Sequence, residues 1–535
     1  MLSVELYDTT LRDGAQREGI SLSVVDKLNI AQKLDELGVR YIEGGWPGSN
    51  PRDAEFFKRS PELSLKNARI AVFGSTRRVG LRPEDDKNLV MLVDTGVEIA
   101  TIVAKASDQQ VSQVLGTTLE ENLAMIADSV KYLKANGMTV FLDAEHYFDG
   151  FKSNPEYSLE CLQVAAEAGA DCLVLCDTNG GGLPDEITKA VKSAKKVTNV
   201  PLGIHAHNDG GLAVANTLAA VSAGVTHVQG TINGYGERCG NANLCSIIPD
   251  LKLKMGIDCV TDEQLARLTE VSRYISEAAN LVPDPFQPYV GISAFSHKAG
   301  YHVDGVTKWA DSYQHIEPAR IGNQQRAVVS ELSGKRNITY KAREMGLDLS
   351  IRSPETQKVL EQVKRMESLG FQYENAEASF ELLVRRARPD YKPLFELVDY
   401  MVVIEKKRRL PTRKSTEEML SEAMLKVKVN GEVNHTVAEG NGPVNALDQA
   451  LRKALLQYYP DMAVIKLVDY KVRILEESTG TESQVRVLIE SSDGNEEWTT
   501  VGSSANIIEA SWLALADSVE YWLVKQRVKQ NPVTS

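Results

Sequence analysis

Short apolar runs rich in β-branched residues alternate with longer amphipathic stretches from the N-terminus to about residue 235. The short runs have the length of buried strands, and the longer stretches repeat their apolar residues with the period of a helix. This alternation is typical of βα units on a parallel sheet. Eight strands are predicted, at residues 4–7, 41–45, 70–74, 99–103, 140–144, 172–176, 202–205 and 227–232.

Helices are predicted between these strands, for example at residues 23–37, 119–135, 159–168 and 212–223. A glycine follows several of them, as is common at helix C-termini: Gly38, Gly137, Gly169 and Gly224. Eight βα units favour a closed (β/α)₈ TIM barrel of the α/β class over residues 1–280, whose catalytic groups we expect at the C-terminal ends of the strands.

The remaining chain has a different organisation. Residues 281–390 are rich in turns and helices, including a helix at 355–367, and predict a helical linker subdomain. Residues 391–535 contain Leu-Val-Asp-Tyr twice, at 397–400 and 467–470. Each copy is followed by strands and a helix, which predicts an α+β regulatory domain of two βββα halves. A chance tetrapeptide match is the weaker alternative.

Charge and composition exclude several classes of function. The 535 residues carry a formal net charge of -13, and only a short basic stretch at 406–414 interrupts the acidic balance. We interpret that stretch as a solvated connector and expect no nucleic-acid partner. No secretory leader precedes the first strand and no run of about 18 apolar residues occurs, so we expect a cytoplasmic protein without a membrane span. The six cysteines lack C-x-x-C spacing and predict reduced thiols.

Two histidines end the seventh predicted strand. His205 and His207 are separated by one residue, so both point to the same face of the strand, into the barrel mouth. A single strand histidine is more often a core residue. A spaced pair at the C-terminal end of a barrel strand favours a metal site instead.

Polar residues also follow the first and eighth strands. The segment 8–16, Asp-Thr-Thr-Leu-Arg-Asp-Gly-Ala-Gln, offers a carboxylate, a guanidinium and an amide; by itself it is better explained as a polar turn with a surface ion pair, but next to the histidine pair it is not. The segment 234–243 is rich in glycine and contains Asn241, whose oxygen is a candidate cation ligand. A phosphate-binding loop is a poor alternative, because the segment lacks the Gly-Lys-Ser/Thr ending.

Three motifs together resemble those of the isopropylmalate, homocitrate and citramalate synthases. They are D-x-T-L-R-D-G-x-Q at 8–16, H-x-H-N-D at 205–209 and G-x-G-E-R-x-G-N at 234–241. The resemblance extends through 296–302 into the C-terminal repeat and covers nearly the whole chain. Within this family, residues 143–150 and 330–335 most resemble the citramalate synthases.

The resemblance implies that a divalent cation is held by Asp13, His205, His207 and Asn241. Such mixed nitrogen and oxygen ligands do not choose between magnesium, manganese and zinc. Positions left open on the cation suit the carboxylate and keto oxygens of a 2-keto acid.

Roles in catalysis and substrate binding follow from the same resemblance. Arg12 faces the keto oxygen, and Gln16, Thr178 and Tyr313 are expected to contact substrate. Glu145 and His302 are the candidates for the base that deprotonates the acyl-CoA. From spacing alone, Thr178 is equally a turn hydroxyl. A structural ion pair for Glu145 and a buried hydrogen-bonding role for His302 are weaker alternatives than catalysis.

The implied reaction condenses acetyl-CoA with pyruvate and water to give (R)-citramalate and CoA, in isoleucine biosynthesis. Bulky residues after Glu145 favour a small acceptor such as pyruvate over the acceptors of isopropylmalate or homocitrate synthesis. A metal-dependent acyl-CoA lyase is an alternative, but lyases of this barrel type have a catalytic cysteine in a G-G-C-P context, whereas Cys239 lies in G-E-R-C-G.

The resemblance also implies an isoleucine effector and a homodimer. An inert barrel that merely carries an amino-acid-binding module is disfavoured, because Asp13 and His207 are both present.

Overall fold

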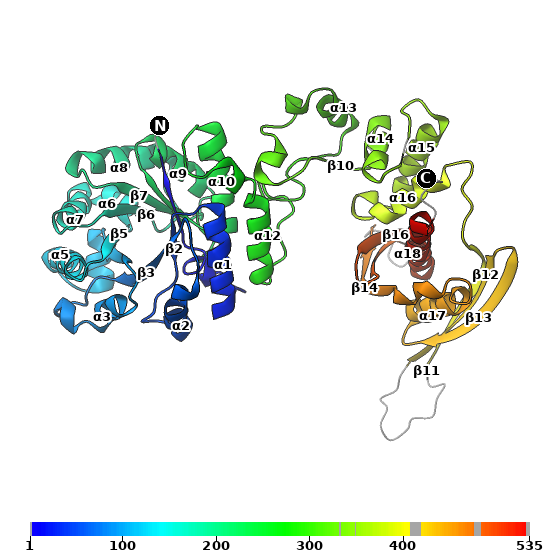
Figure 1. Ribbon diagram of the computed structural model, residues 1–535, viewed down its shortest axis with the longest axis horizontal. Coiled ribbons are helices and arrows are strands. Elements are labelled where there is room, and N and C mark those ends of the chain that lie inside the picture. The colour runs from blue at the N-terminus through cyan, green and yellow to red at the C-terminus, as the bar shows by residue number, and fades with distance from the viewer. Residues whose placement is uncertain (1–2, 331–332, 348, 407–418, 476–482, 531–535) are drawn as a thin grey trace, which may run out of the picture. The chain divides into compact units, whose positions relative to one another are not determined.

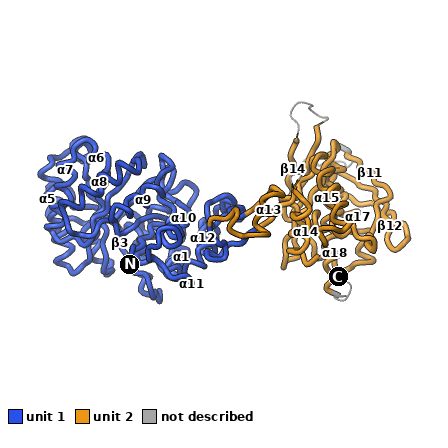
Figure 2. Tube along the Cα trace, turned by 90° about the horizontal axis from the view of Figure 1, so that it is seen from above, with its two compact units in different colours: residues 1–295, 316–325 blue, residues 296–315, 326–535 orange. Residues whose placement is uncertain are grey.

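The computed structural model describes residues 3–330, 333–347, 349–406, 419–475 and 483–530. The predicted basic stretch therefore lies almost wholly outside the described residues, as do two residues of the 330–335 segment. The chain forms two compact units, residues 1–295 with 316–325 and residues 296–315 with 326–535 (Figure 2). The domain division predicted near residues 280 and 390 stays a prediction. Among the described helices, none has both the length and the apolar character needed to cross a membrane.

The first unit contains a closed barrel of eight parallel strands in chain order, in which β1 pairs with both β2 and β8. Helices surround this barrel (Figure 1). The predicted TIM barrel is therefore confirmed. The strands are β1 Glu5–Asp8, β2 Tyr41–Glu43, β3 Arg69–Ser75, β4 Ile99–Lys105, β5 Thr139–Glu145, β6 Cys172–Asp177, β7 Leu202–Ala206 and β8 His227–Gly230.

The helices of this unit begin and end close to the predicted positions. Gly38, Gly137, Gly169 and Gly224 all have positive φ angles, as expected for residues that end helices in the left-handed conformation. The helices are α1 Val24–Leu37, α2 Pro51–Arg59, α3 Lys87–Asp94, α4 Asp108–Gln110, α5 Leu119–Ala135, α6 Tyr147–Ser153, α7 Pro155–Glu167, α8 Pro184–Val197, α9 Ala213–Ser222, α10 Leu244–Pro249, α11 Asp262–Leu265 and α12 Leu268–Ala278.

Two predicted strands are longer than the observed ones. Strand β2 ends at Glu43 because Gly45 has φ of 140°, which turns the chain out of the extended conformation. Strand β8 ends at Gly230, and a short 3-10 helix follows at Ile232–Gly234. Both departures occur at the C-terminal rim, where the backbone leaves the barrel to form loops.

Aromatic side chains fill the interior of the barrel beneath this rim. Tyr7, Tyr41 and Phe141 pack with Cys172 and Val174 in one buried cluster. The His227 ring lies among the three aromatic rings, and burial lowers the pKa of this histidine to about 3. His227 is therefore a neutral core residue. Because this layer is packed, polar chemistry is confined to the C-terminal mouth of the barrel.

The linker region in the second unit is largely helical, as predicted. The helix expected at 355–367 is α15 Pro354–Ser368. A two-stranded parallel sheet joins β9 to β10, which the sequence analysis did not predict. The remaining elements are β9 Ser296–His297, α13 Gly300–Lys308, β10 Arg326–Ala327, α14 Lys335–Glu344 and α16 Glu377–Arg386.

The C-terminal region consists of two βββα halves, which confirms the prediction. Each half is a three-stranded antiparallel sheet followed by a helix, and the two halves share one apolar core. The register shifts between Leu397 and Asp399 in one half and between Leu467 and Asp469 in the other. The repeated tetrapeptide thus marks the same irregularity twice, which excludes a chance match. The elements are β11 Glu396–Lys406, β12 Met419–Val429, β13 Glu432–Gly440, α17 Pro443–Leu455, β14 Lys466–Ile474, β15 Val485–Ser492, β16 Glu497–Ser504 and α18 Ile507–Gln530.

Candidate metal centre

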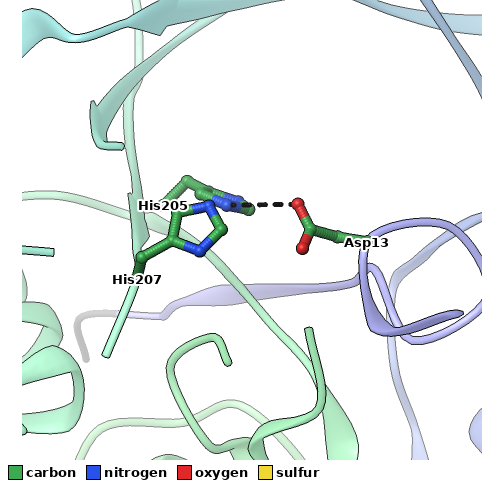
Figure 3. Close-up of side chains that lie close together, drawn as sticks. All are labelled: Asp13, His205 and His207. Carbon is green, nitrogen blue, oxygen red and sulfur yellow. Dashed lines mark ion pairs between the residues drawn. The ribbon is translucent and has the colours of Figure 1, made fainter. Parts of the chain in front are cut away.

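Asp13, His205 and His207 meet at the C-terminal mouth of the barrel (Figure 3). Each offers a ligand atom, and these atoms all lie within 4.8 Å of one another. His205 Nε2 is 3.8 Å from Asp13 Oδ2. Ligand atoms at such separations suit a single ion with bonds of about 2.0–2.2 Å. All three residues are buried.

Asn241 joins this cluster from the glycine-rich loop. Its Nδ2 donates to Asp13 Oδ1 at 2.7 Å, and the loop backbone forms a bridge to His207. A Cβ atom at Gly236 would collide with the Asn241 amide and lie 3.1 Å from Asp13 Oδ1, so glycine at this position permits the close approach. The structure therefore brings together all four predicted ligands.

The polar atoms left without partners fit a cation. Asn241 Oδ1 and His207 Nδ1 are buried, and neither has a hydrogen-bond partner among the described residues. Buried acceptors without partners are costly, and a bound cation would satisfy them. One carboxylate, two imidazoles and one amide oxygen form a donor set that divalent metals accept.

Burial keeps both imidazoles in the form that binds metals. Burial, and then the neighbouring His207, lower the pKa of His205 to about 4. Burial also lowers the pKa of His207. For Asp13, burial alone would raise the pKa, but the charge of Arg12, and in acid the charges of the protonated histidines, hold it well below its ordinary value. At neutral pH the cluster therefore presents one carboxylate and two neutral imidazoles.

A glutamine fixes the orientation of His205. Gln229 Nε2 donates to Asp143 Oδ1 at 3.1 Å, so the amide oxygen of Gln229 faces His205 Nδ1 at 2.9 Å. An amide oxygen only accepts, hence Nδ1 carries the hydrogen. The lone pair of His205 then lies on Nε2, which faces Asp13.

Arg12 is held beside the cluster by two carboxylates and a ring. Its Nε donates to Glu43 Oε2 at 2.5 Å and its Nη1 to Asp13 Oδ2 at 2.9 Å. The guanidinium lies 3.9 Å from the centre of the Phe73 ring. Tyr7 Oη donates to the second oxygen of Glu43 at 2.8 Å. The Arg12 guanidinium therefore has a fixed position at the rim of the barrel.

Gln16 is exposed on the 3-10 helix Gly14–Gln16, directly after Arg12 and Asp13. Together with Arg12, it lines a cavity of about 290 Å³ whose walls also include Trp46 and Arg52. Gln16 thus lies near the site but on its outer side.

Thr178 and Glu145 lie at the same rim, each with a partner. Thr178 Oγ1 accepts a hydrogen bond of 2.8 Å from the backbone N–H of His146, which leaves its own hydrogen available for donation. Glu145 forms an ion pair with Lys105, its register partner on the neighbouring strand. Glu145 is thus an ion-pair partner in this structure, which is the structural role considered as the alternative to catalysis.

His302 and Tyr313 belong to the second unit and lie together there. Their rings are stacked, with centroids 4.3 Å apart and an interplanar angle of 27°. These two predicted residues are therefore adjacent, and their part in the chemistry of the barrel remains a prediction.

Sequence reasoning missed the residues that orient the predicted ones. Glu43 and Gln229 lie on strands β2 and β8, and Asp143 lies on β5. Arg238 donates to both oxygens of Asp209 and to the carbonyl of Thr178, so it pins the glycine-rich loop to two neighbouring loops. A charged or amide residue inside an otherwise apolar strand was the available signal for the first three.

Three segments of the chain match known families in chain order. Residues 3–275 match the family described as HMGL-like, residues 289–370 the homocitrate synthase post-HMGL domain-like family, and residues 374–523 the LeuA allosteric (dimerisation) domain. A buried Asp-His-His cluster on an HMGL-like barrel is thus combined with a C-terminal domain of an allosteric and dimerising type.

Related proteins match over almost the whole chain. The (R)-citramalate synthase of Geobacter sulfurreducens is 53% identical over 525 residues, which cover 98% of this chain and 98% of that protein. The (R)-citramalate synthase of Aquifex aeolicus is 50% identical, with the same coverage of both chains. The 2-isopropylmalate synthase of Methanocaldococcus jannaschii is 32% identical and covers 98% of this chain and 95% of its own. The chain belongs to the (R)-citramalate synthase family of HMGL-like enzymes.

Proposed function

We propose that this chain condenses acetyl-CoA with pyruvate and water to give (R)-citramalate and CoA. The observation that carries the proposal is the buried cluster of Asp13, His205 and His207, with Arg12 held 2.9 Å from Asp13 Oδ2, in a chain of this family. The cluster supplies a cation site, and Arg12 supplies a fixed positive charge where oxygen becomes negative in the transition state.

We propose Asp13, His205, His207 and Asn241 as the ligands of a divalent cation, either magnesium, manganese or zinc. When bound, this cation supplies Lewis-acid polarisation of the keto group. The neutral imidazoles and the carboxylate need lose no proton to bind it, because their pKa values already lie below neutral pH.

The protein's own groups then perform three tasks. Thr178 donates its hydroxyl hydrogen to the carboxylate of pyruvate, because its oxygen already accepts from His146 N. A base, Glu145 or His302, removes a methyl proton from acetyl-CoA, and the resulting carbanion attacks the keto carbon. Arg12 stabilises the alkoxide that forms, and water then cleaves the thioester to release CoA. Gln16 and Tyr313 are proposed as further substrate contacts.

The first test is release of free thiol from acetyl-CoA with pyruvate, 2-ketoisovalerate or 2-ketoglutarate, each with and without a chelator. Pyruvate is expected to give the fastest release, and chelation is expected to abolish it. Preference for another keto acid would move the enzyme to isopropylmalate or homocitrate synthesis. The absence of thiol release with any of the three acids would contradict a condensing activity and favour the lyase.

Replacing Gln229 tests whether the orientation of His205 matters for the cation. Gln229→Leu removes the acceptor of the Nδ1 hydrogen, and losses of outer hydrogen-bond partners weaken metal binding about 10–100-fold. We expect this loss in calorimetric titration of metal-free protein with Mn²⁺, with thiol release partly restored at saturating Mn²⁺.

The matched control for this variant is Thr101→Val, which also alters a buried barrel side chain but one bonded to Tyr7 rather than to His205. We expect it to bind Mn²⁺ as the unmodified protein does. Equal affinities of Gln229→Leu and Thr101→Val would show that Gln229 does not position His205.

We propose isoleucine as the effector of the C-terminal domain, and a homodimer as the assembly. The match to an allosteric (dimerisation) domain over residues 374–523 supports both. Isoleucine is expected to inhibit thiol release by the full chain but not by a truncation ending near residue 393. Retained Mn²⁺ binding would show that the truncated barrel is folded. Equal inhibition of both proteins would exclude the C-terminal domain as the effector site.

A further inference from the structure

A cavity of about 480 Å³ lies in the second unit, between the end of α15, the 3-10 helix Tyr373–Asn375 and strands β14 and β15. Its charged lining is predominantly basic: four cationic side chains face two carboxylates, and Phe371 and Leu475 supply an apolar part of the wall. The charged lining residues are Lys298, Lys364, Arg473, Arg486, Glu367 and Glu374. The lining therefore carries an excess of two positive charges.

Two of these cations oppose each other directly. Arg473 and Arg486 are register partners in the antiparallel pair of β14 and β15. Side chains in such positions lie on the same face of the sheet with Cβ atoms about 4.5–5.5 Å apart, and like charges there are destabilising. Glu374, which pairs with Lys298, and Glu367 attract Arg486, but each does so more weakly than Arg473 repels it. The two opposed arginines thus remain a source of repulsion at this wall of the cavity.

Arg486 is fixed in position by neutral groups. Its Nε donates to the carbonyl of Gly370 at 2.5 Å and its Nη1 to Gln372 Oε1 at 2.6 Å. These bonds orient the guanidinium without neutralising it, and they leave Nη2 available for a ligand. Burial, and then the charge of Arg473, lower the pKa of Arg486.

The turn that holds Arg486 is closely packed. Gly370 has φ of 92°, and a Cβ atom there would lie 2.5 Å from Leu475 and 2.6 Å from Ser503 Oγ. Glycine therefore lets the end of α15 approach the sheet, so that the Gly370 carbonyl reaches Arg486. The cavity is thus formed by a specific close contact between the linker helices and the C-terminal sheet.

We propose that this cavity binds a small anion that carries two negative charges, of the phosphate or dicarboxylate class. Such an anion between Arg473 and Arg486 would replace their repulsion by two charge-assisted interactions. Its two charges would balance the excess on the lining. The volume also admits an organic group attached to the anion, against Phe371 and Leu475.

The cavity is connected to a segment with a proposed catalytic role. Lys298 forms an ion pair with Glu374 at the cavity wall and lies two residues before helix α13, on which His302 lies. An anion that competes with Glu374 for Lys298 would therefore affect the segment that leads into helix α13. Binding of the anion itself does not depend on the proposed reaction, so a binding measurement remains informative if the chain does not condense acetyl-CoA.

The test is calorimetric titration of the full, metal-free chain with inorganic phosphate and, separately, with succinate, at constant ionic strength set by chloride. We expect saturable binding of at least one probe at one site per chain. Tighter binding of phosphate assigns a phosphate-bearing ligand, and tighter binding of succinate assigns a dicarboxylate. No saturable heat with either probe would overturn the proposal.

Variants separate this cavity from other anion sites such as the barrel mouth. Arg473 is exposed, so Arg473→Gln is expected to keep the fold and to weaken binding at least tenfold. The matched control is Arg365→Gln, which replaces an exposed arginine that lies on α15 and does not line the cavity. Equal affinities of the unmodified protein and Arg473→Gln would overturn the proposal.

The thermal midpoint of unfolding gives a second readout, because the effect of Arg473→Gln on this midpoint is expected to differ between chloride and the anionic probe. In chloride, Arg473→Gln is expected to raise the midpoint, because it removes the cross-strand repulsion. At a probe concentration that saturates the unmodified chain, that chain is expected to gain more stability than the variant, because the variant binds the probe at least tenfold more weakly. An identical gain in both proteins would place the bound anion elsewhere.

Discussion

The burial of Arg12 between two carboxylates is the interaction on which the candidate site depends. Glu43 and Asp13 flank the guanidinium at 2.5 Å and 2.9 Å, and the side chains of Arg12, Asp13 and Glu43 are only 12%, 6% and 0% exposed. Buried charges are tolerated only when they are paired. Because both histidines are neutral at pH 7, the group retains one excess negative charge, which a divalent cation would offset. The barrel fold supplies this arrangement by ending β1, β2 and β7 at one rim.

The C-terminal region shows how a repeated sequence imposes a repeated structure. The same irregularity in strand pairing occurs at Asp399 and Asp469, and each half packs its helix on one face of its sheet. The linker helices contact this region through Arg486, which bonds to Gly370 and Gln372, and the register of β14 with β15 places Arg473 opposite it. The barrel rim thus has a buried group with an excess negative charge, and the cavity wall of the second unit has an excess of positive charge.

The sequence predicted the parts of the structure that depend on local patterns. All eight barrel strands, the two βββα halves and the four clustered residues Asp13, His205, His207 and Asn241 follow from periodicity and motifs. The orienting contacts could not be predicted, because they join side chains distant in sequence. Gln229 and Asp143 are 86 positions apart, and the pairing of Glu145 with Lys105 depends on the register of β4 with β5. Sequence motifs identify the candidate ligands and reactive groups. The side chains that orient these groups depend on which strands become neighbours in the fold.

The most direct test of the central claim is to identify the product formed from acetyl-CoA labelled with ¹³C in both acetyl carbons and from unlabelled pyruvate. The full chain with a divalent metal is mixed with both substrates, and the products are analysed by mass spectrometry. The account predicts a five-carbon hydroxy dicarboxylate that contains both labelled carbons, and none after chelation. Labelled acetate without a labelled dicarboxylate would show thioester hydrolysis alone and would contradict the account.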